Sequence, residues 1–168
     1  MTIYTIGHSN VSAERIIELL KEHEIQVLVD VRSAPYSRYS PQFNRESFKA
    51  ELKTKAGIDY EHAGGTLGGR PEDPTCYKED GKPDYEAIQK KPWYSDGITY
   101  LLQVAEKQKT AIMCSEEDPD RCHRHKLITQ TLLEKKIEVV HIRGSGQLEK
   151  ALKAEAPKGK TKQLPLRL

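Results

Sequence analysis

Residues 111–125 (AIMCSEEDPDRCHRH) gather several of the side chains in this protein that can do chemistry. An apolar run delivers a thiol, a hydroxyl and a carboxylate at Cys114, Ser115 and Glu116, and a second thiol and two imidazoles follow. Buried strands usually end in turn residues, whereas nucleophiles, acids, bases and metal ligands gather where reactions occur. We therefore expect a functional site at the end of this run.

Cys114 allows several interpretations. A helix N-terminus beside it favours a thiolate, while the acidic residues at 116–120 oppose ionisation. Phosphate-cradle chemistry of the cysteine phosphatase or rhodanese kind fits this acidic, proline-containing loop poorly. No cofactor or metal is predicted; zinc or iron held by Cys114, Cys122 and His125 is the minor alternative, against ordinary core side chains. Three cysteines fit reduced thiols better than a disulfide between Cys114 and Cys122.

Asp30 is the one charged residue in the apolar run 27–31 (VLVDV). An unpaired carboxylate inside a strand is costly, so it needs a partner. Arg32 lies on the same side of the predicted strand. The two side chains form either a structural salt bridge that orders the following loop or a pair in which Asp30 is a general base or an orienting carboxylate.

The elements that position these groups alternate between short apolar runs and helical patterns, which is typical of parallel strands joined by crossover helices. We predict strands at 3–6, 27–31, 59–63, 110–113 and 138–142. The predicted helices, with Ser12 and Asp118 as N-caps of the first and fourth, span 13–23, 45–55, 94–107, 119–136 and 147–154.

These elements predict a single α/β domain over residues 1–156, with a mostly parallel, Rossmann-like sheet and helices on both faces. A long Gly/Pro-rich insert at 64–83 is expected to act as a lid or binding loop, or to be mobile. Residues 157–168 are basic, lack periodicity and are expected to be a flexible tail.

Polar side chains follow four of the predicted strands at the end where an open parallel sheet binds ligands. The alternative for each is that loops are simply polar. The residues are His8 and Ser9; Asp30, Arg32 and Ser33; Cys114, Ser115 and Glu116; and Arg143, Gly144 and Ser145.

Composition narrows the classes of protein. The chain has 168 residues, 31% of them charged, with a formal net charge of +2. It lacks a signal-peptide pattern at its start and any apolar stretch near the roughly 18 residues of a membrane span. We therefore expect a cytoplasmic protein without a membrane partner.

Four motifs, in this order, resemble the domain of unknown function 488 (DUF488) family. The resemblance spans residues 3 to about 142 and implies a compact α/β domain with its signature residues at the positions just described, without implying a reaction. The motifs are TIGHS at 5–9, DVRSAP at 30–35 with Ser37, LGG at 67–69, and MCSE at 113–116 continuing through Pro119 to CHR at 122–124.

One hypothesis is a hydrolase or group transferase acting on an anionic or sugar-bearing substrate, such as a nucleotide, a nucleoside or a nucleic-acid unit. Asp30 and Glu116 would be its acid and base, with His8 relaying a proton. Alternatively, Cys114 would be the nucleophile, activated by His8 or His123. The predicted substrate-binding residues are Ser9, Arg32, Ser33, Ser37, Arg38, Gly68, Gly69, Arg70, Ser115, His123 and Arg124, with Arg32, Arg38 and Arg70 holding the anion.

The other hypothesis is a nucleic-acid-binding module without turnover. Aromatic side chains among basic residues can stack bases and follow phosphates, and the basic tail would add nonspecific contact. Tyrosines in loops also serve simply to anchor the loop to the body. The aromatic residues concerned are Tyr36, Tyr39, Phe43, Tyr77 and Tyr94.

Overall fold

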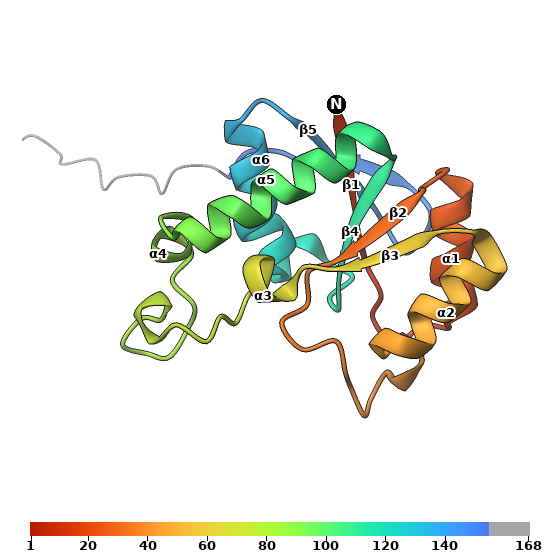
Figure 1. Cartoon of the computed structure of the whole chain (residues 1–168), viewed down its shortest axis with the longest axis horizontal. Coiled ribbons are helices and arrows are strands. Elements are labelled where there is room, and N and C mark those ends of the chain that lie inside the picture. Colours follow the sequence, from red (N-terminus) through yellow and green to blue (C-terminus); the bar gives the residue numbers. More distant parts are fainter. Residues whose placement is uncertain (155–168) are drawn as a thin grey trace, which may run out of the picture.

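Five strands of the chain pair side by side in parallel, and a sixth strand joins one edge in the opposite direction (Figure 1). The computed structural model describes residues 1–154. The strand order is β3-β2-β4-β1-β5-β6, which confirms the predicted mostly parallel α/β sheet. The strands are β1 (Thr2–Gly7), β2 (Val27–Asp30), β3 (Asp59–His62), β4 (Thr110–Cys114), β5 (Glu138–Ile142) and β6 (Leu148–Lys150).

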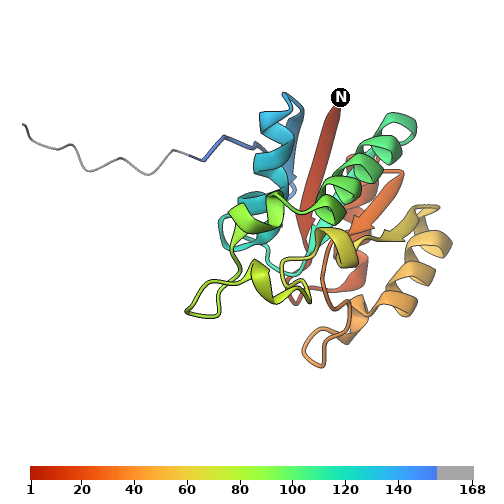
Figure 2. The same ribbon diagram turned by 60° about the vertical axis from the view of Figure 1, so that its left-hand side comes forward.

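Helices cover both faces of the sheet, as expected (Figure 2). On one face lie α1 (Ala13–Glu22) and α2 (Arg45–Ala56), and on the other α5 (Pro92–Lys107), the π-helix η4 (Arg124–Thr129) and α6 (Gln130–Glu134). Because successive strand residues point to opposite faces, Ala111 and Met113 pack toward α1 and α2, while Ile112 packs toward α5. β4 is buried along its whole length.

The chain changes sides at β4. The loops that follow β1 and β2 lead to α1 and α2 on one face, whereas the loop after β4 leads to η4 on the other. Since β4 lies between β1 and β2, the connections diverge on both sides of its carboxyl end. Ligands of open α/β sheets bind at such a switch point.

The first predicted helix forms almost as expected. The Ser12 hydroxyl caps α1 by accepting a hydrogen bond from the Arg15 amide. α2 ends at Gly57, whose left-handed backbone (φ 64°) suits a residue without a side chain. No helix among residues 1–154 is long and apolar enough to cross a membrane.

The predicted helix at 119–136 is wrong as one continuous element. Asp118 does cap a helical turn with Pro119 first, but that turn is the short 3-10 helix η3 (Pro119–Arg121). The backbone is extended at Cys122 (φ −128°, ψ 146°), and the chain then enters η4 and α6. Apolar periodicity carries no signal for this interruption, because the core residues after it keep a helical spacing.

The predicted helix at 147–154 is also wrong. Gly146 has a positive φ (91°), and the chain turns back there, so β6 pairs antiparallel with β5. The segment 64–83 is less irregular than predicted, because it contains α3 (Gly64–Leu67) and the 3-10 helix η2 (Pro74–Cys76), and it leads to the unpredicted α4 (Tyr85–Gln89). A further 3-10 helix, η1 (Pro41–Phe43), precedes α2. The predicted basic tail at 157–168 lies outside the described residues.

Candidate functional site

The carboxyl ends of β1, β2 and β4 open into a pocket of about 1150 Å³, which we call the rim pocket. The loops after β2 and after β3 project from this end of the sheet, away from the N-terminus (Figures 1 and 2). Most of the side chains predicted from the sequence line it: His8, Ser9, Arg32, Ser33, Ser37, Gly69, Arg70, Cys114, Ser115, Glu116 and His123. Four predicted residues are not among its lining: Asp30, Arg38, Gly68 and Arg124.

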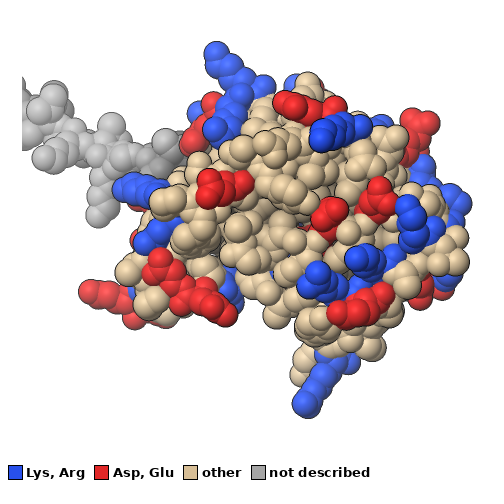
Figure 3. All heavy atoms as spheres, viewed as in Figure 1, with Lys and Arg blue, Asp and Glu red and all other residues tan. Residues whose placement is uncertain are grey.

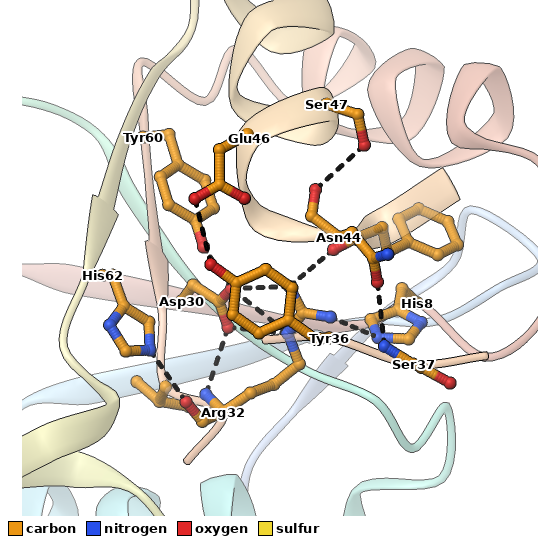
Figure 4. A network of polar contacts seen from close by, with 12 residues as sticks. His8, Asp30, Arg32, Tyr36, Ser37, Asn44, Glu46, Ser47, Tyr60 and His62 are labelled. Carbon is orange, nitrogen blue, oxygen red and sulfur yellow. Dashed lines mark hydrogen bonds and ion pairs between the residues drawn. The ribbon is translucent and has the colours of Figure 1, made fainter. Parts of the chain in front are cut away.

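Asp30 is fully buried beneath the pocket, and both oxygens of its carboxylate accept hydrogen bonds (Figure 4). The Arg32 guanidinium reaches it through Nε (2.9 and 3.1 Å) and Nη2 (2.7 Å), and the Arg32 amide donates to the same carboxylate (3.1 Å). The Tyr60 hydroxyl donates a further hydrogen bond. The geometry corresponds to an orienting ion pair, in which Asp30 fixes Arg32.

Strand β3 supports this pair with two side chains that point the same way. Besides Tyr60, His62 places its Nε2 3.0 Å from the Arg32 carbonyl oxygen (Figure 4). Burial and the adjacent Asp30 carboxylate raise the pKa of Tyr60, so its hydroxyl stays protonated as a donor. The floor of the rim pocket is therefore tied to the edge strand of the sheet.

His8 enters the floor from the end of β1. Its Nδ1 donates to the Ser9 carbonyl oxygen (2.6 Å), which leaves Nε2 to accept from Arg32 Nη1 (3.3 Å). The ring stacks on Phe43 with 4.3 Å between centroids. Burial lowers the pKa of His8 to about 4, so this imidazole is neutral at neutral pH.

Cys114 and Cys122 meet at the floor, where the structure joins them in a disulfide. The expectation of separate thiols is wrong for this pair, because it rested on cysteine number and compartment. The turn at η3 folds the chain back and brings together sulfurs separated by eight positions. Cys76, the free cysteine of the described residues, is buried elsewhere.

Arg124 lies directly behind Cys114. Its side chain is fully buried, with Nη1 3.9 Å from Cys114 Sγ and Nη2 donating to the Glu117 carbonyl oxygen (2.8 Å). Nε has no hydrogen-bond partner in the described part of the chain, and no carboxylate there forms an ion pair with this guanidinium. Burial lowers the pKa of Arg124 to about 10, which leaves it charged at neutral pH.

His123 lines the rim pocket between the end of β2 and Cys122. Its Nε2 donates to the Val31 carbonyl oxygen (3.0 Å), and its Nδ1 lies 3.7 Å from Cys122 Sγ. Burial lowers the pKa of His123 to about 4. A β-carbon on Gly69 would lie 2.7 Å from this ring, so only glycine allows the loop to pass so closely.

The end of β5 is apart from the rim pocket, contrary to the predicted convergence of four strands. Arg143 binds the Glu117 carboxylate through Nε (2.9 Å) and Nη2 (3.1 Å), and the Gly144 amide donates to the same group. These hydrogen bonds lower the pKa of Glu117 to about 2. This clamp holds the loop after β4 in place and leaves the neighbouring Glu116 to face the pocket.

The alternative metal set is not assembled. Cys114 and Cys122 are joined, but His125 points its Nδ1 to His141 Nε2 at 3.1 Å. Among residues 1–154, no group of three or more His, Cys, Asp or Glu side chains is arranged to hold a metal ion.

Part of the pocket wall was not predicted. Arg121, Tyr85 and Trp93 line it, as do Glu72 and Asp73. The sequence signals for Glu72, Asp73 and Arg121 were the interrupted segment 64–83 and the turn at 118–121, and nothing marked Tyr85 or Trp93. Their common location results from the packing of loops, which periodicity does not encode.

Together, the doubly wound sheet and the polar pocket at its switch point define an α/β protein with a Rossmann-like fold. Residues 12–131 match the model of the domain of unknown function DUF488, and the chain belongs to this family, which confirms the resemblance. No curated protein and no solved structure matches the chain.

Proposed function

We propose that this protein is an enzyme that binds an anionic, ring-bearing substrate of the nucleotide or nucleoside class in the rim pocket and catalyses hydrolysis or group transfer. The observation that carries the proposal is the placement of a sulfur, Cys114, between the pocket and a buried guanidinium, Arg124, which forms no direct ion pair within residues 1–154. A nearby cation favours the thiolate, which is the nucleophilic form of cysteine. The reduced protein thus has a nucleophile at the pocket floor.

The binding half of the proposal rests on the lining. Arg70 and Arg121 are exposed at the pocket mouth, where guanidinium groups match phosphate or carboxylate oxygens. Tyr85 and Trp93 offer aromatic surface for a base. Arg32 serves less as an anion ligand than predicted from the sequence, since Asp30 already neutralises it.

Proton transfer falls to groups that face the pocket. Asp30 is a positioning residue, because its contacts with Arg32 and Tyr60 occupy it below the floor. Glu116 is exposed at the mouth and His8 is a neutral imidazole, so these two side chains are the acid–base candidates.

A nucleic-acid-binding module is the second candidate, and the loop after β2 favours it. Tyr36 is 56% exposed and Tyr39 88% exposed, with Arg38 between them. Against it, basic and acidic side chains are interspersed on the face drawn in Figure 3, where they form no continuous basic stripe. Either activity suits the cytoplasmic location expected from the sequence.

A ligand screen followed by a turnover assay tests the proposal. Nucleotides, nucleosides, sugar phosphates and short oligonucleotides would be tested for thermal stabilisation of the reduced protein. We expect a small anionic ligand to stabilise it, and expect Arg70→Ala with Arg121→Ala to abolish that effect. Cys114→Ser should retain binding and lose turnover, measured by chromatography of the products.

Two outcomes would contradict the enzyme proposal. One is the absence of any stabilising small ligand. The other is oligonucleotide binding that survives Cys114→Ser and is lost in Tyr36→Ala with Tyr39→Ala, which would favour the binding module instead.

A further inference from the structure

The rim pocket contains two sulfurs, and group transfer needs only one. Cys122 lines the pocket beside Cys114 and is 6% exposed, against 2% for Cys114. Their Cα atoms are 7.3 Å apart, slightly beyond the range of about 4.4 to 6.8 Å usual for disulfides. The same backbone therefore also accommodates the reduced pair.

The two sulfurs have different surroundings. Cys114 Sγ faces Arg124 Nη1 at 3.9 Å and the Glu116 carbonyl oxygen at 3.7 Å. Cys122 Sγ faces His123 Nδ1 at 3.7 Å and the Arg124 amide at 3.5 Å. One sulfur lies against a permanent cation and the other against a neutral base.

The buried Arg124 guanidinium forms no direct ion pair among residues 1–154, and the carboxylates of Glu116, Glu117 and Asp118 act on it only at longer range. A fully buried charge without a counter-charge is costly, and the nearest atom able to carry a negative charge is Cys114 Sγ. The Glu117 carboxylate, which lies on the same loop, makes its hydrogen bonds to Arg143 and Gly144 and attracts Arg124 only at longer range. Reduction to a Cys114 thiolate would place an anion in direct contact with Arg124, which favours the thiolate form of Cys114.

We infer that Cys114 and Cys122 form a redox couple that reduces a small anionic disulfide bound in the rim pocket. The inference rests on the proposed function for the anion-binding part of the pocket. It goes further by naming sulfur as the atom of the substrate that reacts. It also makes Cys122 the thiol that resolves the mixed disulfide on Cys114.

The cycle balances in two exchanges. The Cys114 thiolate attacks one sulfur of the substrate disulfide, a mixed disulfide forms, and the first thiolate product leaves. The Cys122 thiol loses its proton to solvent in the pocket, and its thiolate then attacks Cys114 Sγ, which expels the second product as a thiolate. The two cysteines lose two electrons, the substrate gains them, and an external dithiol restores the reduced pair by the reverse exchanges.

The size and charge of the pocket favour a disulfide over a smaller oxidant. A volume of about 1150 Å³ far exceeds what a simple hydroperoxide would occupy. Both sulfurs face this space, as the second exchange requires, and Arg70 and Arg121 lie at its mouth to receive the charged ends of the substrate.

Release of thiolate from bis(carboxynitrophenyl) disulfide, a dianionic aromatic disulfide, tests the couple on the reduced full-length chain. We expect the wild type to release two thiolates per chain rapidly and to retain no adduct by mass spectrometry. Cys122→Ser should release one and retain the mixed disulfide on Cys114, and Cys114→Ser should lose the rapid reaction. Cys76→Ala is the matched control and should behave as the wild type.

Arg124→Met tests the positioning of the thiolate. We expect the alkylation rate of Cys114 near neutral pH to fall at least about tenfold, and the midpoint of its pH profile to rise. If this variant fails to fold, the pH profile of Cys122→Ser, in which Cys114 is the pocket's only thiol, gives the same information, and a midpoint near an ordinary cysteine would overturn the role of Arg124.

The inference fails if the folded wild type keeps a stable mixed disulfide on Cys114 after a single release, or if a hydroperoxide oxidises it faster than either disulfide probe does. A neutral probe, bis(hydroxyethyl) disulfide, separates this result from the proposed function. Equal rates with both probes, and double release, would support the redox couple and refute the anion-binding pocket. A dianion preference that Arg70→Ala removes supports both.

Discussion

Replacing Asp30 with asparagine removes the negative charge beneath the rim pocket and retains the shape of the side chain. Asp30 is fully buried and holds Arg32, itself 7% exposed, through three side-chain contacts between 2.7 and 3.1 Å. Breaking a buried ion pair by removing one partner costs about 3 to 5 kcal/mol, because the other charge stays buried and unpaired. Asparagine keeps one oxygen for the Tyr60 hydroxyl, so we expect a loss of about 3 kcal/mol.

Urea unfolding followed by circular dichroism measures this loss. With a slope of about 2 kcal/mol per molar urea, the midpoint should fall by about 1.5 M at an unchanged slope. Adding Arg32→Met to Asp30→Asn removes the orphaned charge and should recover part of the loss. Glu14→Gln, which breaks the exposed pair with Lys55, is the matched control and should leave the midpoint unchanged.

A midpoint of Asp30→Asn that equals that of Glu14→Gln would refute this reasoning. It would mean that water or rearrangement neutralises Arg32, so that the pair does not organise the floor. A double variant that is less stable than Asp30→Asn would show that Arg32 contributes through its other contacts, with the Phe43 carbonyl and His8, more than it costs as an unpaired charge.

Acidification should destabilise the fold, because the pKa of His8 is lowered from 6.5 to about 4 and the unfolded chain therefore binds the proton first. The free energy of unfolding then decreases as pH falls from above 6.5 toward 4, by about 3 kcal/mol at most for this group. Urea midpoints measured at a series of pH values should depend less steeply on pH in His8→Gln than in the wild type. Gly7→Ala should lower the melting temperature strongly, since its β-carbon would lie 1.7 Å from the Glu116 carbonyl oxygen, whereas Gly65→Ala meets open space and should melt like the wild type; equal melting temperatures would contradict the close approach. Ser12→Ala should cost about 1 kcal/mol in urea unfolding through loss of the α1 cap, and no loss would mean that water replaces the hydroxyl.

The sequence predicted the sheet well because its central strands are buried on both faces. The largely apolar runs at β2 and β4 have few alternative interpretations, and the structure places both inside the sheet, away from its edges. Helices with a clear cap, such as α1 after Ser12, were also predictable. Failures occurred where tertiary pairing decides the outcome: β6 is a strand because the turn at Gly146 brings it to the edge of β5.

The candidate site was predictable as a location and less so as an arrangement. Residues at the ends of parallel strands must share one rim, which is why His8, Arg32 and Cys114 lie together. Whether a side chain points into the pocket or below it depends on contacts remote in sequence. Asp30 points below because Tyr60 from β3 reaches it, and no local pattern announces such a contact.

Because Tyr60 and His62 of β3 contact Asp30 and Arg32, the rate at which the backbone amides of β3 exchange with solvent should report on the stability of the pocket floor. β3 is an edge strand that pairs only with β2 in the described sheet, and edge elements open more readily than central ones. Each opening of β3 withdraws Tyr60 and His62 from the floor at once. We therefore expect the opening of this four-residue strand to set how often the floor is complete, and a ligand that holds Arg32 in place from the pocket side to slow amide exchange in β3.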